Sequence, residues 1–161
     1  MFTLGVRRCL VLEEKSDDDH LLSAQFWEGA EPQGGVTTRM LCDLGREHRI
    51  HVGASILEAR GEHFYNVFVL AGPNGDLLGE VFKQTPCALE ALYFRGATSN
   101  TVGIDCPALG IRVAVSICYD NQLSFSPNAV AECNADILLM PHCAPFVDGV
   151  PQSVKDQWIR G

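Results

Sequence analysis

The apolar residues in the middle of the chain occur in short runs that predict β-strands. Residues 50–59, 63–71 and 77–84 are each rich in β-branched, aliphatic or aromatic residues, and each run has the length of a strand. The pair Asn74-Gly75, which separates the second run from the third, favours a tight turn between antiparallel strands. We therefore expect an antiparallel meander or hairpin over residues 50–84.

Other elements are predicted upstream of the meander and at the end of the chain. Between residues 36 and 48 the apolar positions recur with helical spacing, and Gly34 and Gly35 precede them as helix breakers. Residues 7–13 form an apolar run that predicts a short buried strand. Residues 151–160 have the pattern expected for the first turns of a helix.

The carboxyl-terminal half alternates between strand and helix patterns. Residues 101–106 and 111–118 predict two strands, a Ser-Pro pair opens a helix over 126–135 with proline at the first helical position, and 136–141 predict a last strand. A strand, helix, strand unit connects parallel strands that are buried on both faces, which agrees with these continuous apolar runs. The fold class expected from the whole pattern is α/β with a mixed sheet.

The composition restricts the class of partner. The chain has 161 residues, which is enough for one domain, and its formal net charge of −8 argues against nucleic acid or an anionic membrane surface as a partner. No apolar run approaches the length of a membrane span, and the first residues lack the pattern of a signal peptide. We expect a cytoplasmic protein.

The cysteines do not indicate a metal or disulfide framework. There are seven, an odd number with irregular spacing and no C-x-x-C pair, so most are expected to be small core residues in a reducing compartment. The acidic run DDDH at 17–20 is expected to be a solvated loop. No cofactor and no metal are predicted. A thiol redox function is disfavoured because no resolving cysteine lies near Cys118 in sequence, and Cys133 and Cys143 would have to fold close to it.

Cys118 differs from the other cysteines because it ends an apolar strand and is followed at once by polar residues. In α/β proteins the carboxyl end of a parallel strand is where ligands bind and chemistry takes place. A thiolate attacks carbonyl or nitrile carbon well, but it needs a partner to accept its proton. His142 ends the neighbouring predicted strand and could line the same cleft. From spacing alone Cys118 is either a nucleophile or a packed core thiol.

Several motifs occur in an order that resembles the nitrilase, or carbon-nitrogen hydrolase, superfamily. They are GEVFKQTP, a glutamate before YFRG, LGIRVAVSICYDNQ and ADILLMPH, and the likeness covers roughly residues 34–145. The resemblance implies a four-layer α-β-β-α sandwich and a hydrolase that cleaves a non-peptide carbon-nitrogen bond. It implies Cys118 as the nucleophile and Lys83 as the group that stabilises the tetrahedral intermediate.

The resemblance also implies the remaining members of the site. Glu14 matches the general base, although Glu13 stands where the family usually has proline, so the choice between the two glutamates stays open. Glu90 matches a second glutamate that positions the lysine or the substrate. The backbone N–H of Tyr119 would help to hold the oxyanion, and the substrate-binding residues would be Tyr119, Asn121 and His142.

The aromatic side chains that follow Glu90 are expected in the protein core. Tyr93 and Phe94 are aromatic, and aromatic residues in such a segment line a protein core more often than a pocket.

Members of this family are longer than the present chain. We expect residues 1–161 to form a single incomplete domain that lacks the first strand and helix and the C-terminal strands, with marginal stability unless another chain covers the gaps. Two hypotheses follow, a thiol amidase or nitrilase and an inactive remnant that acts as a binding or subunit module. The sequence does not distinguish nitrile, amide and carbamyl substrates, and a homo-oligomer is compatible with it.

Overall fold

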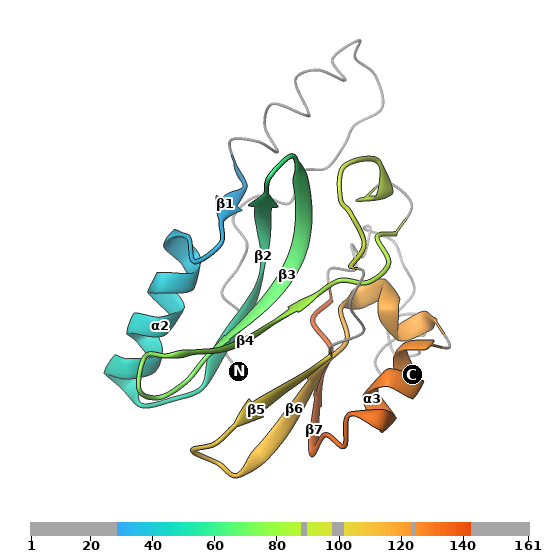
Figure 1. Ribbon diagram of the computed structural model, residues 1–161. Coiled ribbons are helices and arrows are strands. Elements are labelled where there is room, and N and C mark those ends of the chain that lie inside the picture. Colours follow the sequence, from blue (N-terminus) through green and yellow to red (C-terminus); the bar gives the residue numbers. More distant parts are fainter. Residues whose placement is uncertain (1–28, 88–89, 98–101, 124, 143–161) are drawn as a thin grey trace, which may run out of the picture.

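Two β-sheets pack face to face in the computed structural model, which describes residues 29–87, 90–97, 102–123 and 125–142 (Figure 1). Within these ranges the first sheet has the order β1-β2-β3-β4 and the second the order β5-β6-β7. The strands of the first sheet are β1 (Glu31–Pro32), β2 (Val52–Arg60), β3 (His63–Ala71) and β4 (Leu77–Phe82). Those of the second are β5 (Gly103–Cys106), β6 (Ile111–Val115) and β7 (Ile137–Leu139).

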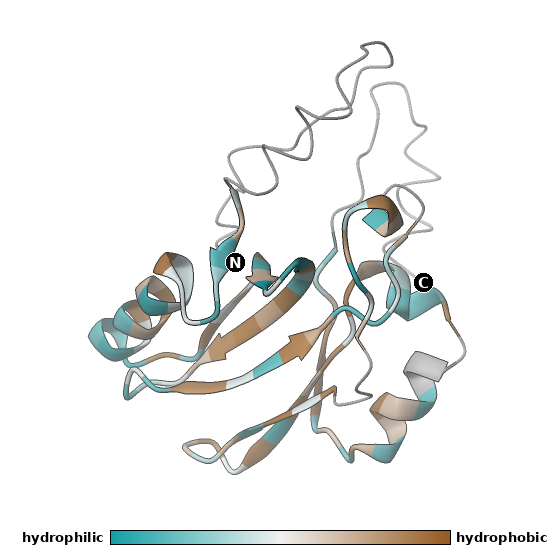
Figure 2. Cartoon of the chain, turned by 45° about the horizontal axis from the view of Figure 1, so that its top comes forward, coloured by the Kyte–Doolittle hydropathy of each residue, from teal (hydrophilic) through white to brown (hydrophobic). Residues whose placement is uncertain are grey.

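Helices flank the two sheets. The helix α2 (Val36–His48) packs against the outer face of the first sheet, and α3 (Phe125–Glu132) lies beside β7, away from that sheet (Figures 1 and 2). Two short 3₁₀ helices, η1 (Glu90–Leu92) and η2 (Cys118–Gln122), follow β4 and β6. The arrangement is a mixed α/β fold with the layers expected for an α-β-β-α sandwich.

The predicted meander is confirmed by the antiparallel pairing of β2 with β3 and of β3 with β4. The Asn74-Gly75 turn joins β3 to β4, and Gly75 has a φ of +83°, a conformation that glycine adopts without strain. Gly45 of α2 approaches this turn so closely that a Cβ atom on it would lie 2.4 Å from the carbonyl oxygen of Gly72. The helix predicted over 36–48 is therefore held directly against the meander.

The core lies on both faces of the central strand β3. One face of β3 contributes Val67, Val69 and Ala71, which pack with Leu41 of α2. The opposite face of the first sheet packs against the second sheet through a cluster of buried side chains: Phe68, Leu70, Val81, Ile104, Cys106, Val113, Val115 and Ile117. Figure 2 shows apolar residues along the strands between the sheets and hydrophilic residues on the outer side of α2.

Charged residues also tie strands of the first sheet together. The carboxylate of Glu58 is fully buried and pairs with Arg60. The same guanidinium binds Glu80 of β4 at 2.6 Å and lies 4.4 Å above the centre of the Phe82 ring. Because Arg60 bridges two carboxylates on different strands, these charges link β2 to β4 across β3 on the face that carries α2.

The strand, helix, strand unit is confirmed, but its last strand is shorter and more exposed than expected. β6 and β7 are parallel, as predicted, and α3 begins at Phe125, so Pro127 lies within the first turn rather than at the first helical position. The side chains of Ile137 and Leu138 are 47% and 42% exposed, so β7 is not buried on both faces. Within the described residues β7 pairs with β6 alone, which explains the exposure.

Two predicted elements, the strand over residues 7–13 and the helix over 151–160, lie outside the described residues. Within those residues no helix is both long enough and apolar enough to cross a membrane.

Candidate active site

Lys83 follows β4 directly, and its side chain points into the protein rather than into solvent. Its backbone N–H donates to the carbonyl oxygen of Asn66 at 2.8 Å, and its own carbonyl accepts from Ala97 at 3.0 Å. These two bonds fix the backbone just beyond the strand. The side chain is only 2% exposed, and a buried ammonium group needs a hydrogen-bonded partner of opposite charge.

That partner is Glu90, the first residue of η1. The Lys83 Nζ atom donates to Glu90 Oε2, and the backbone N–H of Cys87 donates to the same oxygen at 2.9 Å. Burial acts to raise the pKa of Glu90, but the hydrogen bonds from Lys83 and Cys87 outweigh it and leave the pKa below its usual range. The structure therefore joins two of the predicted site residues in one ion pair, with Glu90 as a carboxylate at neutral pH.

Cys118 lies at the carboxyl ends of β6 and β7, as the sequence predicts. Its backbone N–H donates to the carbonyl oxygen of Pro141 at 2.9 Å, and its φ of +51° is in the left-handed region. That conformation costs a residue other than glycine on the order of 1 kcal/mol and needs support from its surroundings. Asn121 provides it, because its Nδ2 atom lies 3.0 Å from Ser116 O and 3.1 Å from Cys118 O.

Asp120 connects the turn that carries Cys118 to the segment that follows Lys83. Its two carboxylate oxygens accept the backbone N–H groups of Gln84 at 3.0 Å and of Thr85 at 2.8 Å. The side chain is 2% exposed, and burial raises its pKa although the two N–H groups act in the opposite direction. In the sequence Asp120 is only one of the polar residues that follow Cys118, and the available signal was a carboxylate placed directly after an apolar strand.

Replacing Asp120 by alanine is expected to lower the free energy of unfolding by about 2–4 kcal/mol. The substitution leaves two partly buried N–H groups without an acceptor, and each such group costs about 1–3 kcal/mol. Urea unfolding monitored by circular dichroism measures the change. The matched control is Asp105→Ala, which removes an exposed carboxylate paired with Arg112 and should change stability by less than about 0.5 kcal/mol. Equal losses in the two variants would contradict the connecting role of Asp120.

The predicted substrate-binding residues lie around the same turn. Tyr119 is partly exposed in η2, and His142 follows β7 with its Nε2 atom 3.3 Å from the Nδ2 atom of Asn121. The structure therefore brings His142 beside the turn that carries Cys118. The amide nitrogen of Asn121 is used by contacts within this turn. The predicted base Glu14 and its alternative Glu13 lie outside the described residues.

Cys87 lies beside the ion pair of Lys83 and Glu90, a position that no sequence pattern indicated. Burial, and then the hydrogen bond and charge of Glu90, raise the pKa of the Cys87 thiol. The cysteines considered from the sequence as partners of Cys118 were Cys133 and Cys143. The thiol of Cys133 instead donates to Val130 within α3 at 3.1 Å, and Cys143 lies outside the described residues.

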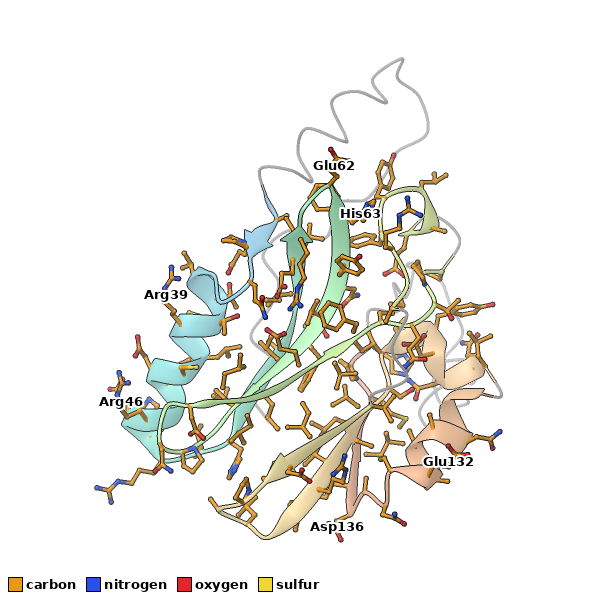
Figure 3. All side chains as sticks on the ribbon, viewed as in Figure 1. Arg39, Arg46, Glu62, His63, Glu132 and Asp136 are labelled. Atoms are coloured by element: carbon orange, nitrogen blue, oxygen red, sulfur yellow. The ribbon has the colours of Figure 1, made fainter. Side chains whose placement is uncertain are left out.

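A cavity of about 660 Å³ lies between the tip of the β2–β3 hairpin, where Figure 3 places Glu62 and His63, and the residues Pro86 and 91–96. Lys83, Glu90 and Cys118 are not among the residues that line it. Tyr93 and Phe94 line it, which corrects the expectation that they belong to the core. Among the described residues, no three side chains of metal-binding type gather into a candidate metal site.

Known proteins match this chain, and a family model matches nearly all of it. The family model described as carbon-nitrogen hydrolase matches residues 9–158. An (R)-stereoselective amidase from Pseudomonas sp is 29% identical over 73% of this chain and 41% of its own length. A nitrilase from Pyrococcus abyssi is 30% identical over 66% of this chain and 40% of its own length. The chain thus spans about two fifths of the length of these relatives.

Solved structures have the same fold. A carbon-nitrogen hydrolase from Helicobacter pylori G27 superposes with a TM-score of 0.69 over 91% of this chain and 48% of its own, at 17% sequence identity. An amidase mutant from Nesterenkonia sp. AN1 superposes with a TM-score of 0.58 over 65% of this chain and 40% of its own, at 20% identity. In that amidase the acetamide moiety of fluoroacetamide is covalently added to the active-site cysteine.

Proposed function

Because the chain belongs to the carbon-nitrogen hydrolase family, we propose that Cys118, Lys83, Glu90 and Glu14 form the site of a thiol hydrolase that cleaves an amide or nitrile. The observation that carries this proposal is the link between two distant segments. Asp120, two residues after Cys118, binds the backbone directly after Lys83, and Glu90 holds the ammonium group of Lys83. This link supports the proposal because it ties the turn of Cys118 to the backbone beside the buried ammonium group of Lys83.

The first half of the proposed reaction forms a covalent intermediate. The sulfur of Cys118 adds to the carbonyl or nitrile carbon while its proton passes to Glu14, the proposed general base. The negative charge that develops on an amide oxygen, or on a nitrile nitrogen, is stabilised by Lys83 and by the backbone N–H of Tyr119. A donor placed in this way is typically worth about 3–4 kcal/mol in the transition state. Glu14 then gives its proton to the departing nitrogen of an amide.

The second half of the reaction releases the acid. Glu14 accepts a proton from water, the water oxygen attacks the thioester carbon, and the bond from carbon to sulfur breaks to regenerate the thiol. A nitrile first forms a thioimidate, which takes up water and loses ammonia before the same hydrolysis. Glu90 touches no reacting atom in this scheme, because its carboxylate is occupied by Lys83 and Cys87. It is a positioning residue for Lys83.

The left-handed conformation of Cys118 supports its proposed role. Strained backbone persists where the surroundings hold it, and it is concentrated at functional sites. The bonds from Asn121 and the bond to Pro141 hold the strained turn on both sides of the thiol. The cavity lined by Pro86 and by the residues that follow Glu90 provides space that we assign to the non-reacting part of the substrate.

A second candidate function is a binding or subunit module without turnover. It is favoured by the exposed apolar side chains of β7 and of Met140, which is 55% exposed. Exposed apolar surface of this kind is typical of a face that another chain covers.

Ammonia release distinguishes the two functions. The chain is incubated with a primary amide, a nitrile and an N-carbamyl amino acid of matched size, and ammonia is measured with glutamate dehydrogenase. The hydrolase proposal predicts ammonia from at least one substrate, and none after the thiols are alkylated with iodoacetamide. No ammonia from any substrate, with all thiols intact and the chain folded by circular dichroism, would support the binding module instead.

A further inference from the structure

Asn66 lies directly opposite Lys83 on the neighbouring strand. The backbone N–H of Lys83 donates to the carbonyl oxygen of Asn66 at 2.8 Å, which continues the antiparallel register of β3 and β4 by one pair. Residues directly opposite each other in such a pair have Cβ atoms about 4.5–5.5 Å apart, with both side chains on the same face of the sheet. The side chain of Asn66 is therefore the cross-strand neighbour of the Lys83 side chain.

Both side chains lie on the face of the first sheet that packs against the second sheet. On β3, Asn66 is followed at alternate positions by Phe68 and Leu70, which belong to the buried cluster between the sheets. On β4, Val81 of the same cluster precedes Lys83 by two residues. Residues two apart on a strand share a face, so Asn66 and Lys83 are placed side by side in the interior.

The two side chains have complementary hydrogen-bonding capacity that is not used. The Oδ1 atom of Asn66 is buried and has no hydrogen-bond partner among the described residues. The ammonium group of Lys83 has three N–H donors, and within the same residues the side chain that accepts from it is that of Glu90. Buried polar groups are normally hydrogen-bonded, and an exception calls for an explanation. Here an unpaired acceptor lies beside a buried cation with donors to spare.

We propose that Asn66 is a positioning residue for Lys83, an inference that rests on the proposed hydrolase function. An ammonium group directs its three N–H bonds toward the corners of a tetrahedron. When the substrate binds, Glu90 accepts from one N–H and the Oδ1 atom of Asn66 accepts from a second. The third N–H then has one direction left, which we assign to the developing oxyanion. Glu90 alone would leave the ammonium group free to rotate about a single hydrogen bond.

A neutral acceptor suits this position because Glu90 already balances the charge of Lys83. A second carboxylate beside the pair would be a buried charge without a counterion of its own, which is destabilising. An amide oxygen orients an N–H bond and leaves the net charge of the pair unchanged. Asparagine therefore provides direction at the Lys83 side chain at a smaller cost in stability than aspartate would.

Substitutions at position 66 separate side-chain shape from hydrogen bonding, because Asn, Asp and Leu have similar shapes. Asn66→Leu removes an unpaired buried oxygen, so its urea midpoint should be unchanged or higher. Its kcat for ammonia release should nevertheless fall by about tenfold to a hundredfold, with KM within about twofold. Asn66→Asp keeps an acceptor and should retain more kcat than Asn66→Leu, although its urea midpoint is lower. Asn66→Ala replaces the leucine variant if circular dichroism shows that leucine prevents folding.

A reversible aldehyde probe reports the same effect without turnover. When propionaldehyde binds, the sulfur of Cys118 bonds to the carbonyl carbon and the thiol proton passes to the oxygen, which then occupies the place of the oxyanion. The affinity is measured as protection of Cys118 against iodoacetamide. We expect this affinity to fall by about tenfold in Asn66→Leu. The rate of alkylation in the absence of aldehyde should stay within about twofold.

The matched control is Ser55→Ala. Ser55 lies opposite Phe68 on β2, which β3 separates from β4, and its Oγ atom is likewise buried without a partner among the described residues. The control removes an unpaired oxygen from the same face and should keep kcat and aldehyde affinity within about twofold. Equal losses in Ser55→Ala and Asn66→Leu, or full aldehyde affinity in Asn66→Leu, would overturn the role of Asn66. Failure of the aldehyde to protect Cys118 in the unsubstituted chain would instead overturn the proposed hydrolase site, and this inference with it.

Discussion

Cys118→Ser is expected to reduce ammonia release by more than about a thousandfold, to the level of the assay blank. The substitution is nearly isosteric and keeps the backbone, so the bond from residue 118 to Pro141 and the support from Asn121 remain. A serine hydroxyl has a much higher pKa than a thiol, and it would need a base matched to that pKa. The variant should therefore fold normally and fail only in forming the covalent intermediate.

The controls for this experiment come from the same chain. Cys42→Ser removes a thiol on α2, and Cys133→Ser removes one directly after α3. Both variants should retain activity within about twofold. Activity of Cys118→Ser comparable to these variants would exclude Cys118 as the nucleophile. Urea midpoints measured on all three variants separate a chemical effect from a folding effect.

Lys83→Met is expected to lower kcat/KM by about a hundredfold to a thousandfold, the usual effect of removing one donor to a developing oxyanion. Methionine fits a buried position and fills most of the volume of the lysine side chain, whose exposure is 2%. Glu90 keeps the N–H group of Cys87, and its side chain is 28% exposed, so its charge stays partly solvated. The loss should therefore appear mainly in kcat and only weakly in stability.

Two further variants serve as comparisons for Lys83→Met. Arg39→Met removes an exposed cation on α2 and is expected to change neither kcat nor the urea midpoint appreciably (Figure 3). Glu90→Gln keeps Lys83 but weakens its partner, and we expect a smaller loss of kcat than in Lys83→Met. If Lys83→Met and Glu90→Gln lose stability to the same degree and keep kcat, the pair is only structural and the proposed role of Lys83 is wrong.

The parts of the fold that depend on local pattern were predictable from the sequence. The Asn74-Gly75 turn and its flanking apolar runs indicate the meander, and the parallel pair β6 and β7 follows from the strand, helix, strand pattern. The helix α2 was predicted with the bounds that it has in the structure, 36–48. The order of the motifs around Lys83 and Cys118 indicated the family, which the family model confirms.

The contacts that join the two halves of the site were not predictable in the same way. Asp120 binds backbone groups 36 and 35 residues away. Such contacts depend on how the two sheets face each other, and no periodicity in the sequence encodes that packing. The exposure of Ile137 is a similar case, because an apolar run does not reveal whether a strand has one neighbour or two.

The most direct test of the central claim is the order in which the thiols react with limiting iodoacetamide near neutral pH, mapped by peptide mass spectrometry. The account predicts that Cys118 is alkylated first, well ahead of Cys42, Cys87 and Cys133, which are also partly exposed. It further predicts that ammonia release falls in step with the fraction of Cys118 that is modified. Labelling spread evenly over the partly exposed thiols, with no preference for Cys118, would contradict the claim that this residue is an activated nucleophile.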